Sequence, residues 1–359
     1  MGYAINLCKF HIYNVAYNHN IAEEGMEMTQ NRVRIVDVAD ALGLSTATIS
    51  NVIHGKTEKI SDETVKRVQQ ELEKSGYIPN MAGILLARNN SRIIGVVVND
   101  HEKYEGHPLE DGYMSKLVNS LAIESERRGF LLIVKLAKRI DDVPLLASLW
   151  NMSAVMVQGF CEVDYQYLKN QMHRPLIIFD GFFPANDSYV NLEVDNYQGG
   201  VVAGEYLNKM GHSRVLCLSD NNICLDALRF QGLCSIIPQS NLMIIPKLKK
   251  ERESFYKSNL DEILKYSAVF AVSDYYALDL IRNLQASGVK IPQDISVLGF
   301  DDTAISADTF PPLTTIRQDC EKRASIAFDL IYELERDINL RKVVSLPVEV
   351  VERETVKKI

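Results

Sequence analysis

Apolar side chains recur at helical spacing in residues 32–78, and this pattern predicts short helices that share one core. A first helix covers residues 35–42 and stops at Gly43, a residue suited to the positive φ of a tight turn. A second helix covers residues 46–54, and the hydroxyl of Ser45 is placed to cap its N-terminus. Two short helices joined by a glycine turn are typical of a helix-turn-helix.

The inward-facing positions of these helices support the same interpretation. Ala39 is small enough to let the first two helices cross closely, and Ile49 and Val52 are placed to fill the core between them. A third helix follows, capped by Ser61 and ended by Gly76. Several positions must coincide for this spacing to occur, so the sequence predicts a helix-turn-helix unit over residues 32–78.

The exposed face of the second helix carries short side chains, which can approach base edges and phosphates closely. A three-helix bundle that binds protein, or nothing, is the alternative, but the small polar surface favours DNA. The candidate DNA-contacting residues of this unit are Ser45, Thr46, Ala47, Thr48, Ser50, Asn51 and His54.

Residues 92–359 hold five short apolar runs, each ending in polar residues and separated by helical stretches such as 117–128, 200–210 and 276–287. Uninterrupted apolar runs of this length are typical of strands that are buried on both faces of a parallel sheet. We therefore predict a doubly wound α/β fold for this part of the chain. The predicted strands are 93–98, 176–179, 215–218, 268–272 and 295–300.

Polar residues at the ends of these strands predict a binding cleft, because ligands bind beyond the carboxyl ends of the strands in doubly wound sheets. A single Asp in such a place would be interpreted as a cap of the following helix, but repetition in five strands favours a polar cleft. Nearby aromatic side chains would add stacking surfaces, and the combination suits sugars or nucleoside-like ligands. These aromatic residues are Phe160, Phe182, Phe183, Tyr275 and Tyr276.

The polar segment 101–113 contains His101 and His107 among acidic residues. A metal ion is one interpretation of that cluster, but a solvated loop is the one that we favour. We therefore predict no metal site and no cofactor.

Composition and charge exclude some classes of protein for this chain. A chain of 359 residues exceeds one ordinary domain, and 47% hydrophobic with 24% charged residues is typical of folded proteins. No apolar stretch approaches the ~20 residues of a membrane-spanning helix. The net charge of −8 argues against a protein that coats nucleic acid, so the DNA contact is predicted to be local.

The cysteines and the N-terminal residues indicate in which cellular compartment the protein is expected. Six cysteines are scattered without a C-x-x-C pair, so neither a disulfide framework nor a zinc cage is expected. Residues 1–31 lack the pattern of a signal peptide, and we treat them as an extension of unknown role. We expect a cytoplasmic protein with reduced thiols and no membrane association.

The motifs together resemble the lactose-repressor (LacI/GalR) family of bacterial transcription regulators. The headpiece motifs are IVDVADALGLSTATISNVIHGK from residue 35, ISDET from residue 60 and GYIPN from residue 76. The motifs of the larger part are DNYQGG from residue 195, RFQG from residue 229, IPQDISVLGFDD from residue 291 and PPLTTIRQ from residue 311. The resemblance runs from residue 33 to the C-terminus.

The resemblance implies a division of the chain into four segments. These are an extension (1–31), a helix-turn-helix DNA-binding domain (32–78), a hinge (79–91) and an effector-binding and dimerisation domain (92–359). The last domain is expected to have two α/β lobes like those of periplasmic binding proteins, joined by three crossings of the chain.

The resemblance also implies how DNA is read. Thr46, Ala47 and Asn51 fall at the base-reading positions of the second helix. Members of the family often carry Arg where this chain has Asn51; Asn pairs with adenine and Arg with guanine, so the operator is expected to depart from the usual half-site. The hinge, with Asn80 and Leu86 as candidate DNA contacts, becomes helical only on DNA in the family and inserts a leucine into the minor groove. An amphipathic linker packed on the larger domain is the alternative.

Carried over by motif, a set of polar residues would line the effector cleft between the lobes. Arg229 would clamp effector hydroxyls, and Ser273 stands where many members have Asn. The candidate effector-binding residues are Asp180, Arg229, Ser273, Asp274, Asp301 and Gln318.

These features predict a sequence-specific repressor of carbohydrate-utilisation genes, controlled by a sugar or sugar derivative. A homodimer on a palindromic operator is expected, since the chain has no C-terminal leucine heptads that would make a dimer of dimers. A sugar-processing enzyme and a solute-binding protein, each with a DNA-tethering module, are the alternatives. No nucleotide-binding, zinc-protease or nucleophile-elbow motif is present, so no catalytic residue is predicted.

Overall fold

The structure, a computed structural model, describes residues 33–53, 55–78, 91–183 and 189–359. These residues fall into two compact units, which are treated separately here. We call residues 33–78 the headpiece and residues 91–359 the core unit.

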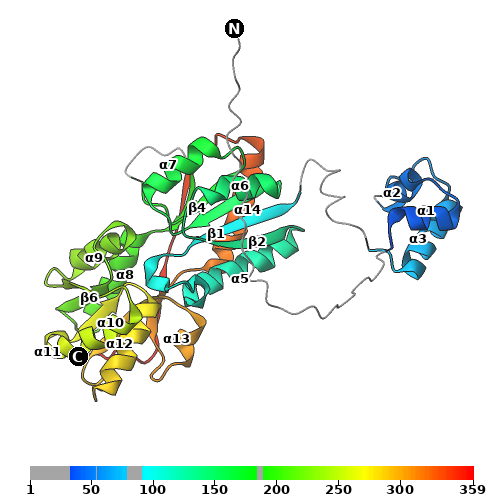
Figure 1. Cartoon of the computed structure of the whole chain (residues 1–359). Coiled ribbons are helices and arrows are strands. Elements are labelled where there is room, and N and C mark those ends of the chain that lie inside the picture. The colour runs from blue at the N-terminus through cyan, green and yellow to red at the C-terminus, as the bar shows by residue number, and fades with distance from the viewer. Residues whose placement is uncertain (1–32, 54, 79–90, 184–188) are drawn as a thin grey trace, which may run out of the picture. The chain divides into compact units, whose positions relative to one another are not determined.

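The headpiece contains three helices, which Figure 1 draws in blue. They are α1 (Ile35–Leu42), α2 (Thr46–Ile53) and α3 (Asp62–Ser75). Gly43 ends α1 in the left-handed conformation with φ of 64°, and Ser61 accepts a hydrogen bond from the Thr64 backbone N–H as the cap of α3. The predicted helix-turn-helix is confirmed, although α2 ends at Ile53 and residue 54 lies outside the described residues.

The headpiece encloses a small apolar core that the spacing of its sequence predicts. Ala39 and Ile49 are almost completely buried, and Val38, Val52 and Val68 complete the cluster. Because Ala39 has only a methyl group, α1 and α2 pack directly against each other, and the outer face of α2 is left to the solvent.

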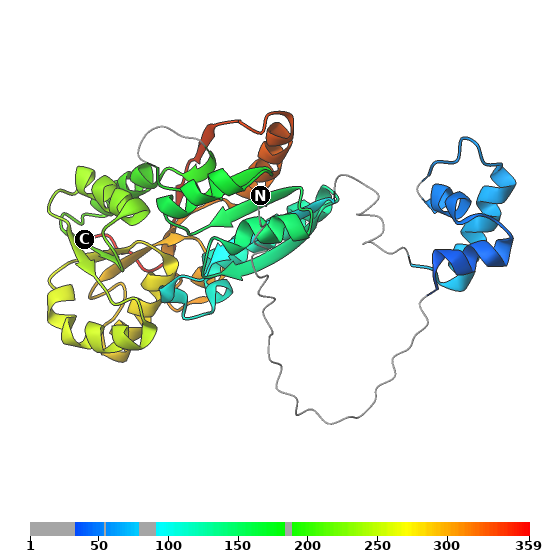
Figure 2. The same cartoon turned by 45° about the horizontal axis from the view of Figure 1, so that its top comes forward.

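The core unit consists of two lobes, each built on a six-stranded sheet (Figures 1 and 2). The N-lobe sheet has the order β11-β5-β4-β3-β1-β2, and the C-lobe sheet has the order β12-β10-β9-β8-β6-β7. All pairs in both sheets are parallel except the pair of β10 with β12. The predicted doubly wound α/β fold is confirmed.

The bounds of the elements are as follows. The N-lobe comprises β1 (Ile93–Asn99), η1 (Glu102–Tyr104), η2 (Pro108–Glu110), α5 (Gly112–Arg127), β2 (Leu131–Ala137), α6 (Asp142–Leu149), β3 (Ala154–Gln158), α7 (Glu162–Gln171), β4 (Leu176–Phe179), β5 (Val190–Val194), α14 (Cys320–Arg336) and β11 (Lys342–Leu346). The C-lobe comprises α8 (Asn196–Lys209), β6 (Val215–Ser219), α9 (Cys224–Ile236), β7 (Asn241–Ile244), α10 (Lys249–Ser258), α11 (Leu260–Ile263), β8 (Ala268–Ala271), α12 (Asp274–Ala286), β9 (Ser296–Asp301), α13 (Ala304–Asp308), β10 (Thr314–Arg317) and β12 (Glu349–Val351).

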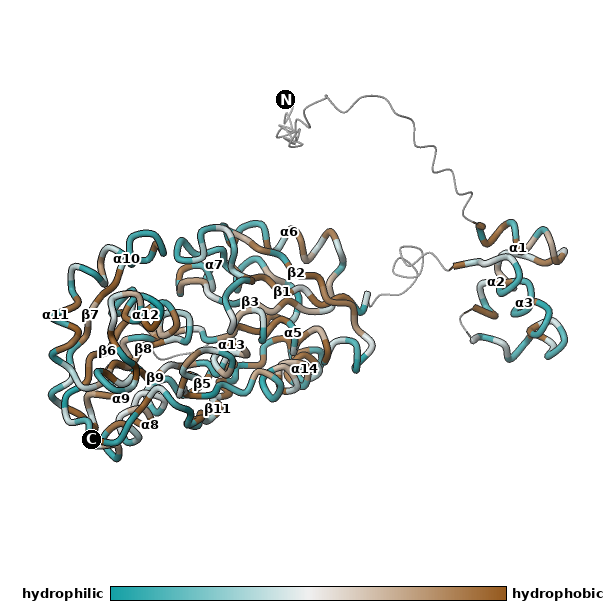
Figure 3. The backbone as a smooth tube through the Cα atoms, turned by 90° about the horizontal axis from the view of Figure 1, so that it is seen from below, coloured by the Kyte–Doolittle hydropathy of each residue, from teal (hydrophilic) through white to brown (hydrophobic). Residues whose placement is uncertain are grey.

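Helices cover both faces of the N-lobe sheet, and this explains its uninterrupted apolar strands. Along β1, Ile94 and Val96 pack into the cluster formed with α5 and α14, whereas Ile93 and Val97 pack into the cluster formed with α6 and α7. Figure 3 shows hydrophobic stretches along the inner strands, with the outer helices alternating between hydrophobic and hydrophilic residues. Both sides of β1 therefore face apolar side chains, as expected for a parallel sheet.

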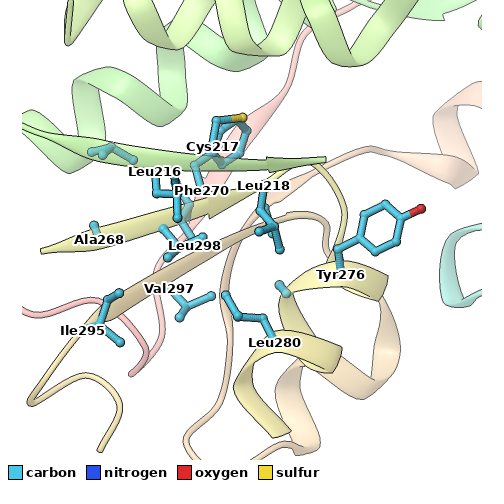
Figure 4. Close-up of a cluster of buried hydrophobic side chains, with 14 of the residues drawn as sticks. Leu216, Cys217, Leu218, Ala268, Phe270, Tyr276, Leu280, Ile295, Val297 and Leu298 are labelled. Atoms are coloured by element: carbon cyan, nitrogen blue, oxygen red, sulfur yellow. The ribbon is translucent and has the colours of Figure 1, made fainter. Parts of the chain in front are cut away.

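A single large cluster fills the C-lobe. It joins β6, β8 and β9 to α12, and Figure 4 shows Leu218 and Val297 on the side of the strands that faces Leu280 of that helix. Tyr276 leaves the same cluster from α12 with its hydroxyl pointing away from the strands. The first turn of α12 is thereby fixed next to the ends of the strands.

The chain crosses between the lobes three times, as the resemblance implies. The crossings lie between β5 and α8, between β10 and α14, and between β11 and β12. No helix within the described ranges is long and apolar enough to cross a lipid bilayer.

Candidate functional site

The outer face of α2 is the candidate DNA-contacting surface of the headpiece. The side chains of Thr46, Ala47 and Asn51 are exposed, while Ser50 is half-buried. These positions lie on the side of α2 opposite to Ile49, which is fully buried. The apolar core thus orients the helix with its short polar side chains outward.

Two of the predicted DNA contacts have structural roles in addition. The Ser45 Oγ atom accepts a hydrogen bond from the Thr48 backbone N–H at 3.1 Å and lies 2.8 Å from the Thr48 Oγ1 atom, so this pair caps α2. Three other predicted contacts, His54, Asn80 and Leu86, lie outside the described residues.

In the core unit, a cavity of about 220 Å³ lies between the two lobes. It is smaller than the ~300–1,000 Å³ of drug-sized ligand pockets, which suits a ligand the size of a monosaccharide or a nucleobase. The structure places five of the six candidate effector residues on its wall, namely Asp180, Arg229, Ser273, Asp301 and Gln318. Asp274 is not among the lining residues.

Arg229 is held at the cavity wall by several contacts. Its Nε atom donates to the Asn196 Oδ1 atom at 2.8 Å, and its Nη1 atom donates to the Val272 carbonyl. The guanidinium carbon lies 3.7 Å from the centroid of the Phe300 ring. A planar cation fixed in this way is preorganised to donate hydrogen bonds to a ligand.

A buried chain of polar side chains runs between the lobes at the back of the cavity. The Arg323 Nη2 atom on α14 lies 2.9 Å from the Oδ1 atom of Asp180, the residue that follows β4. The Arg323 Nη1 atom donates to the Gln318 Oε1 atom at 3.0 Å. The Gln318 Nε2 atom then donates to the Asp301 Oδ1 atom at 2.6 Å. Arg323 was not among the residues predicted from the sequence. Its side chain is 0% exposed, and an arginine is almost never buried so completely unless it is paired, as here with Asp180.

The assignment of Asp274 to the cavity wall is wrong. Its carboxylate turns into the C-lobe, where it accepts hydrogen bonds from the backbone and hydroxyl of Thr303 and from the hydroxyls of Ser306 and Thr315. Burial raises its pKa to about 6. Burial and the neighbouring Asp274 also raise the pKa of Asp301 well above its ordinary value. Asp274 therefore holds the segment after β9 in place rather than facing a ligand.

The segment 101–113 is solvated in its middle part, where residues 105–107, 109 and 110 are exposed, but residues near both of its ends form part of the cavity wall. Lys103, Tyr104, Asp111 and Tyr113 all line the cavity. The Lys103 Nζ atom lies 5.0 Å from the centroid of the Tyr104 ring and 5.8 Å from that of Tyr276 on the C-lobe. The strand-end pattern points to Asn99, which lines the cavity, but it does not extend to these later residues.

Two further contacts tie this part of the N-lobe to the C-lobe. The Glu102 Oε2 atom lies 3.4 Å from the Lys247 Nζ atom, and the Lys116 Nζ atom donates to the Asp302 carbonyl at 2.7 Å. With the cation–π contact of Lys103, three lysines bridge the lobes beside the cavity.

The aromatic lining differs from the one predicted. Of the aromatic residues that the sequence suggested, Tyr276 lines the cavity, and Tyr104 and Tyr113 join it from the N-lobe. The residues absent from the wall of the cavity are Phe160, Phe182, Phe183 and Tyr275. Phe183 stacks on Tyr189 instead, with ring centroids 4.7 Å apart.

Carboxylates outnumber cations around the cavity. The acidic lining residues are Asp111, Asp180, Asp220, Asp226 and Asp301, against the cations Lys103 and Arg229. Burial lowers the pKa of His101, which therefore adds no charge at neutral pH. In the part of the chain that the structure describes, no three His, Cys, Asp or Glu residues gather closely enough to hold a metal ion. The site is suited to hydrogen bonding rather than to metal chemistry.

Comparisons with known proteins agree with the two-unit organisation. Residues 34–80 match the model of "Bacterial regulatory proteins, lacI family", and residues 205–356 match the model of a "Periplasmic binding protein-like domain". The HTH-type transcriptional repressor PurR of Vibrio atlanticus is 28% identical over 90% of this chain and 99% of its own length.

Solved structures of regulators share the fold. A Lac repressor dimer bound to operator and the anti-inducer ONPF has a TM-score of 0.77 at 22% identity, and the match covers 91% of this chain and 99% of that one. The transcriptional regulator CelR in complex with cellobiose has a TM-score of 0.64 at 20% identity, and the match covers 90% of this chain and 100% of that one.

Proposed function

The chain belongs to the lacI family of bacterial regulatory proteins, and from that premise we propose that a small, uncharged, hydroxyl-rich molecule such as a sugar is its effector. The protein is a DNA-binding transcriptional repressor of the lacI type with a ligand-binding domain, and it is a regulator rather than an enzyme. The proposal therefore concerns what the cavity binds and how binding reaches the DNA.

The observation that carries the proposal is the composition of the cavity wall. Carboxylates accept hydrogen bonds from hydroxyl groups, and the fixed guanidinium of Arg229 donates them, which together suit a polyol. The acidic side chains of the wall act mainly as hydrogen-bond acceptors, and a phosphate offers them only further acceptors, whereas a sugar offers hydroxyl donors. A neutral sugar therefore fits better than a sugar phosphate.

A nucleoside-like effector is less well supported by the same wall. Stacking of a base requires a free aromatic face, but the rings of Tyr104 and Tyr276 both hold the Lys103 ammonium group. Among the solved structures of this fold, two other regulators are bound to cellobiose and to ribose. Both features favour a sugar.

We propose that the active form is a homodimer on a palindromic operator. Two helix-turn-helix units related by a two-fold axis need two half-sites. The N-lobe offers a face for such a dimer, where Ile123 on α5 is 61% exposed and Leu131 on the edge strand β2 is 53% exposed. Apolar side chains gathered on an edge strand and its covering helix favour association with a second copy.

Binding between the lobes has a physical route to the DNA. A ligand that contacts Asp180 and Gln318 on one side and Asp301 on the other would favour one arrangement of the lobes. The proposed dimer face on α5 belongs to the N-lobe, so a change in the arrangement of the lobes would also change the arrangement of the two headpieces. Coupling of this kind is typically worth 1–3 kcal/mol, or roughly 5–150-fold in operator affinity.

A thermal-shift panel on the full chain tests the effector class. Neutral monosaccharides and disaccharides, their phosphorylated counterparts and nucleosides are compared, since a ligand at 100 times its Kd adds about 2.7 kcal/mol of stability. We expect a neutral sugar to raise the Tm, and Arg229→Lys to weaken this effect by about 10–100-fold, the equivalent of one or two hydrogen bonds to a charged group. Stabilisation by phosphorylated sugars alone, or by nucleosides alone, would contradict the proposal.

A further inference from the structure

Two exposed thiols are close in sequence to residues that line the cavity, one thiol on each lobe. Gly159 lines the cavity from the N-lobe, and Cys161 follows it by two residues. Leu225 lines the cavity from the C-lobe, and Cys224 directly precedes it. Each lobe therefore has an exposed cysteine within two residues of the cavity wall.

Both cysteines stand where a helix begins. Cys161 precedes α7, and its backbone N–H donates to the Asp164 Oδ2 atom at 3.0 Å, while Cys224 is the first residue of α9. Burial raises the pKa of the Cys224 thiol, and the nearby Cys161 and Glu162 raise it further. The Cys161 and Glu162 side chains of the N-lobe are thus near enough to act on the Cys224 thiol of the C-lobe, which agrees with the positions of Gly159 and Leu225 on the wall of one cavity.

The other cysteines of the described residues are placed differently. Cys217 and Cys320 are buried in the cores of the C-lobe and N-lobe. Cys234 is half-exposed but lies ten residues after Cys224 on α9, which corresponds to about 15 Å along a helix. Cys161 and Cys224 are thus the described pair that the fold brings to one opening.

We propose that Cys161 and Cys224 form a reversible disulfide across the cleft when a peroxide oxidises them. The thiolate of Cys161 attacks one oxygen of hydrogen peroxide, and the O–O bond breaks to give a sulfenic acid and hydroxide. The thiolate of Cys224 then attacks the Cys161 sulfur, so that the S–S bond forms, the S–O bond breaks and a second hydroxide leaves. Two thiols are oxidised by two electrons, and one peroxide is reduced to two waters.

The disulfide would restrict changes in the arrangement of the two lobes, on which the proposed coupling between ligand and DNA depends. A disulfide requires Cα atoms about 4.4–6.8 Å apart, so it holds α7 and α9 together and fixes the lobes in a closed arrangement. The crosslink also restricts the unfolded chain over the segment between the two residues, which stabilises the core unit. This inference does not depend on which molecule fills the cavity, and its test stands apart from the test of the effector class.

Peptide mapping of the full chain tests the bond directly. Protein carrying Cys8→Ser is treated with a slight excess of hydrogen peroxide at pH 8, alkylated, digested and analysed by mass spectrometry without reduction. We expect one linked pair of peptides that contains Cys161 and Cys224, on a monomeric chain, together with a rise in Tm that dithiothreitol reverses.

Single variants provide the matched controls. Cys161→Ser and Cys224→Ser should each abolish both the linked peptides and the reversible rise in Tm, whereas Cys234→Ser should keep both. Linkage between two chains, linkage through Cys234, or oxidation of Cys161 that stops at the sulfinic acid while Cys224 stays reduced would overturn the proposal.

Discussion

The side-chain amide of Gln318 donates a hydrogen bond to the Asp301 Oδ1 atom across 2.6 Å. Gln318 lies in the segment that crosses from the C-lobe to the N-lobe, and Asp301 ends strand β9 of the C-lobe. The other end of the same amide accepts from Arg323, which is paired with Asp180. One amide thus joins the polar ends of two strands that belong to different lobes.

Replacing Gln318 by Leu should destabilise the core unit by about 1–3 kcal/mol, because Asp301 loses a donor and the buried Arg323 loses an acceptor. Urea unfolding followed by circular dichroism measures the loss. Gln166→Leu on the exposed surface of α7 is the matched control, since it removes only a 3.3 Å hydrogen bond to Glu162. An equal effect of the two substitutions would show that the chain of polar groups between the lobes contributes nothing.

The carboxyl of Glu193 on β5 should make stability depend on pH. Burial and the charge of Asp180 raise the pKa of Glu193 to about 7 from the ordinary value of 4.5. The folded protein then holds a proton that the unfolded chain has lost between these two pH values, so the free energy of unfolding falls as the pH rises from about 4.5 to about 7.

Urea midpoints of the wild type and Glu193→Gln at pH 5, 6, 7 and 8 measure this effect. In the variant, the free energy of unfolding should lack this contribution to its fall with pH. The stability of the variant relative to that of the wild type should therefore increase as the pH rises. Glu205→Gln, which removes an exposed carboxylate from α8, should follow the wild-type profile. Parallel profiles for the wild type and Glu193→Gln would exclude Glu193 as the source of the pH dependence.

Asn51 lies on the exposed face of α2, and its replacement by Arg should change the operator sequence that is selected. Asn pairs bidentately with adenine and Arg with guanine, and each such pair discriminates by about 1–3 kcal/mol. Selection from a randomised operator pool should therefore gain guanine at one symmetric position. Gln69→Arg adds the same charge on α3 away from the bases, so it should strengthen binding without altering the selected sequence. Identical selected sites for Asn51→Arg and the wild type would contradict the assignment of this side chain.

A charge on the exposed face of α5 and β2 should weaken the proposed dimer. Ile123→Glu together with Leu131→Glu places two carboxylates in each half of a two-fold face, where each meets its copy. Sedimentation velocity should show more monomer, and operator affinity should fall because one headpiece reads one half-site. Leu149→Glu, at a 73% exposed position on α6, is the control for an added charge elsewhere. A dimer that persists in the double variant would place the interface on another face.

The strands that the sequence predicts well are those buried on both sides. The run Leu-Ile-Ile-Phe coincides with β4, because every one of its side chains packs against helices or neighbouring strands. Strand β2 was missed because it lies at the edge of its sheet and carries the exposed Lys135, which interrupts the apolar run. Strand β3 was missed as well, although it lies inside the sheet and all its residues are buried, so burial on both faces does not by itself make a strand recognisable.

Residues of the candidate site could be predicted where polar residues directly follow strands. They could not be predicted where the direction of a side chain determines whether it lines the cavity. Asp180 and Asp301 end strands and line the cavity, as expected. Asp274 stands in a similar place but turns inward to Thr303, Ser306 and Thr315, which no pattern of residue types reveals. Arg323 reaches the site from a helix that returns after a crossing, so only the three-dimensional fold brings it to Asp180.

The most direct test of the account is fluorescence anisotropy of the full chain on promoter fragments from its own genome, repeated at several salt concentrations with and without neutral sugars. We expect selective binding to a palindromic site, a fall in affinity of about 10³–10⁵ between 50 and 200 mM salt for 6–10 phosphate contacts, and a change in affinity of roughly 5–150-fold on addition of one sugar. Binding that is equal on all fragments, or selective binding that no neutral sugar alters while a charged ligand does, would contradict it.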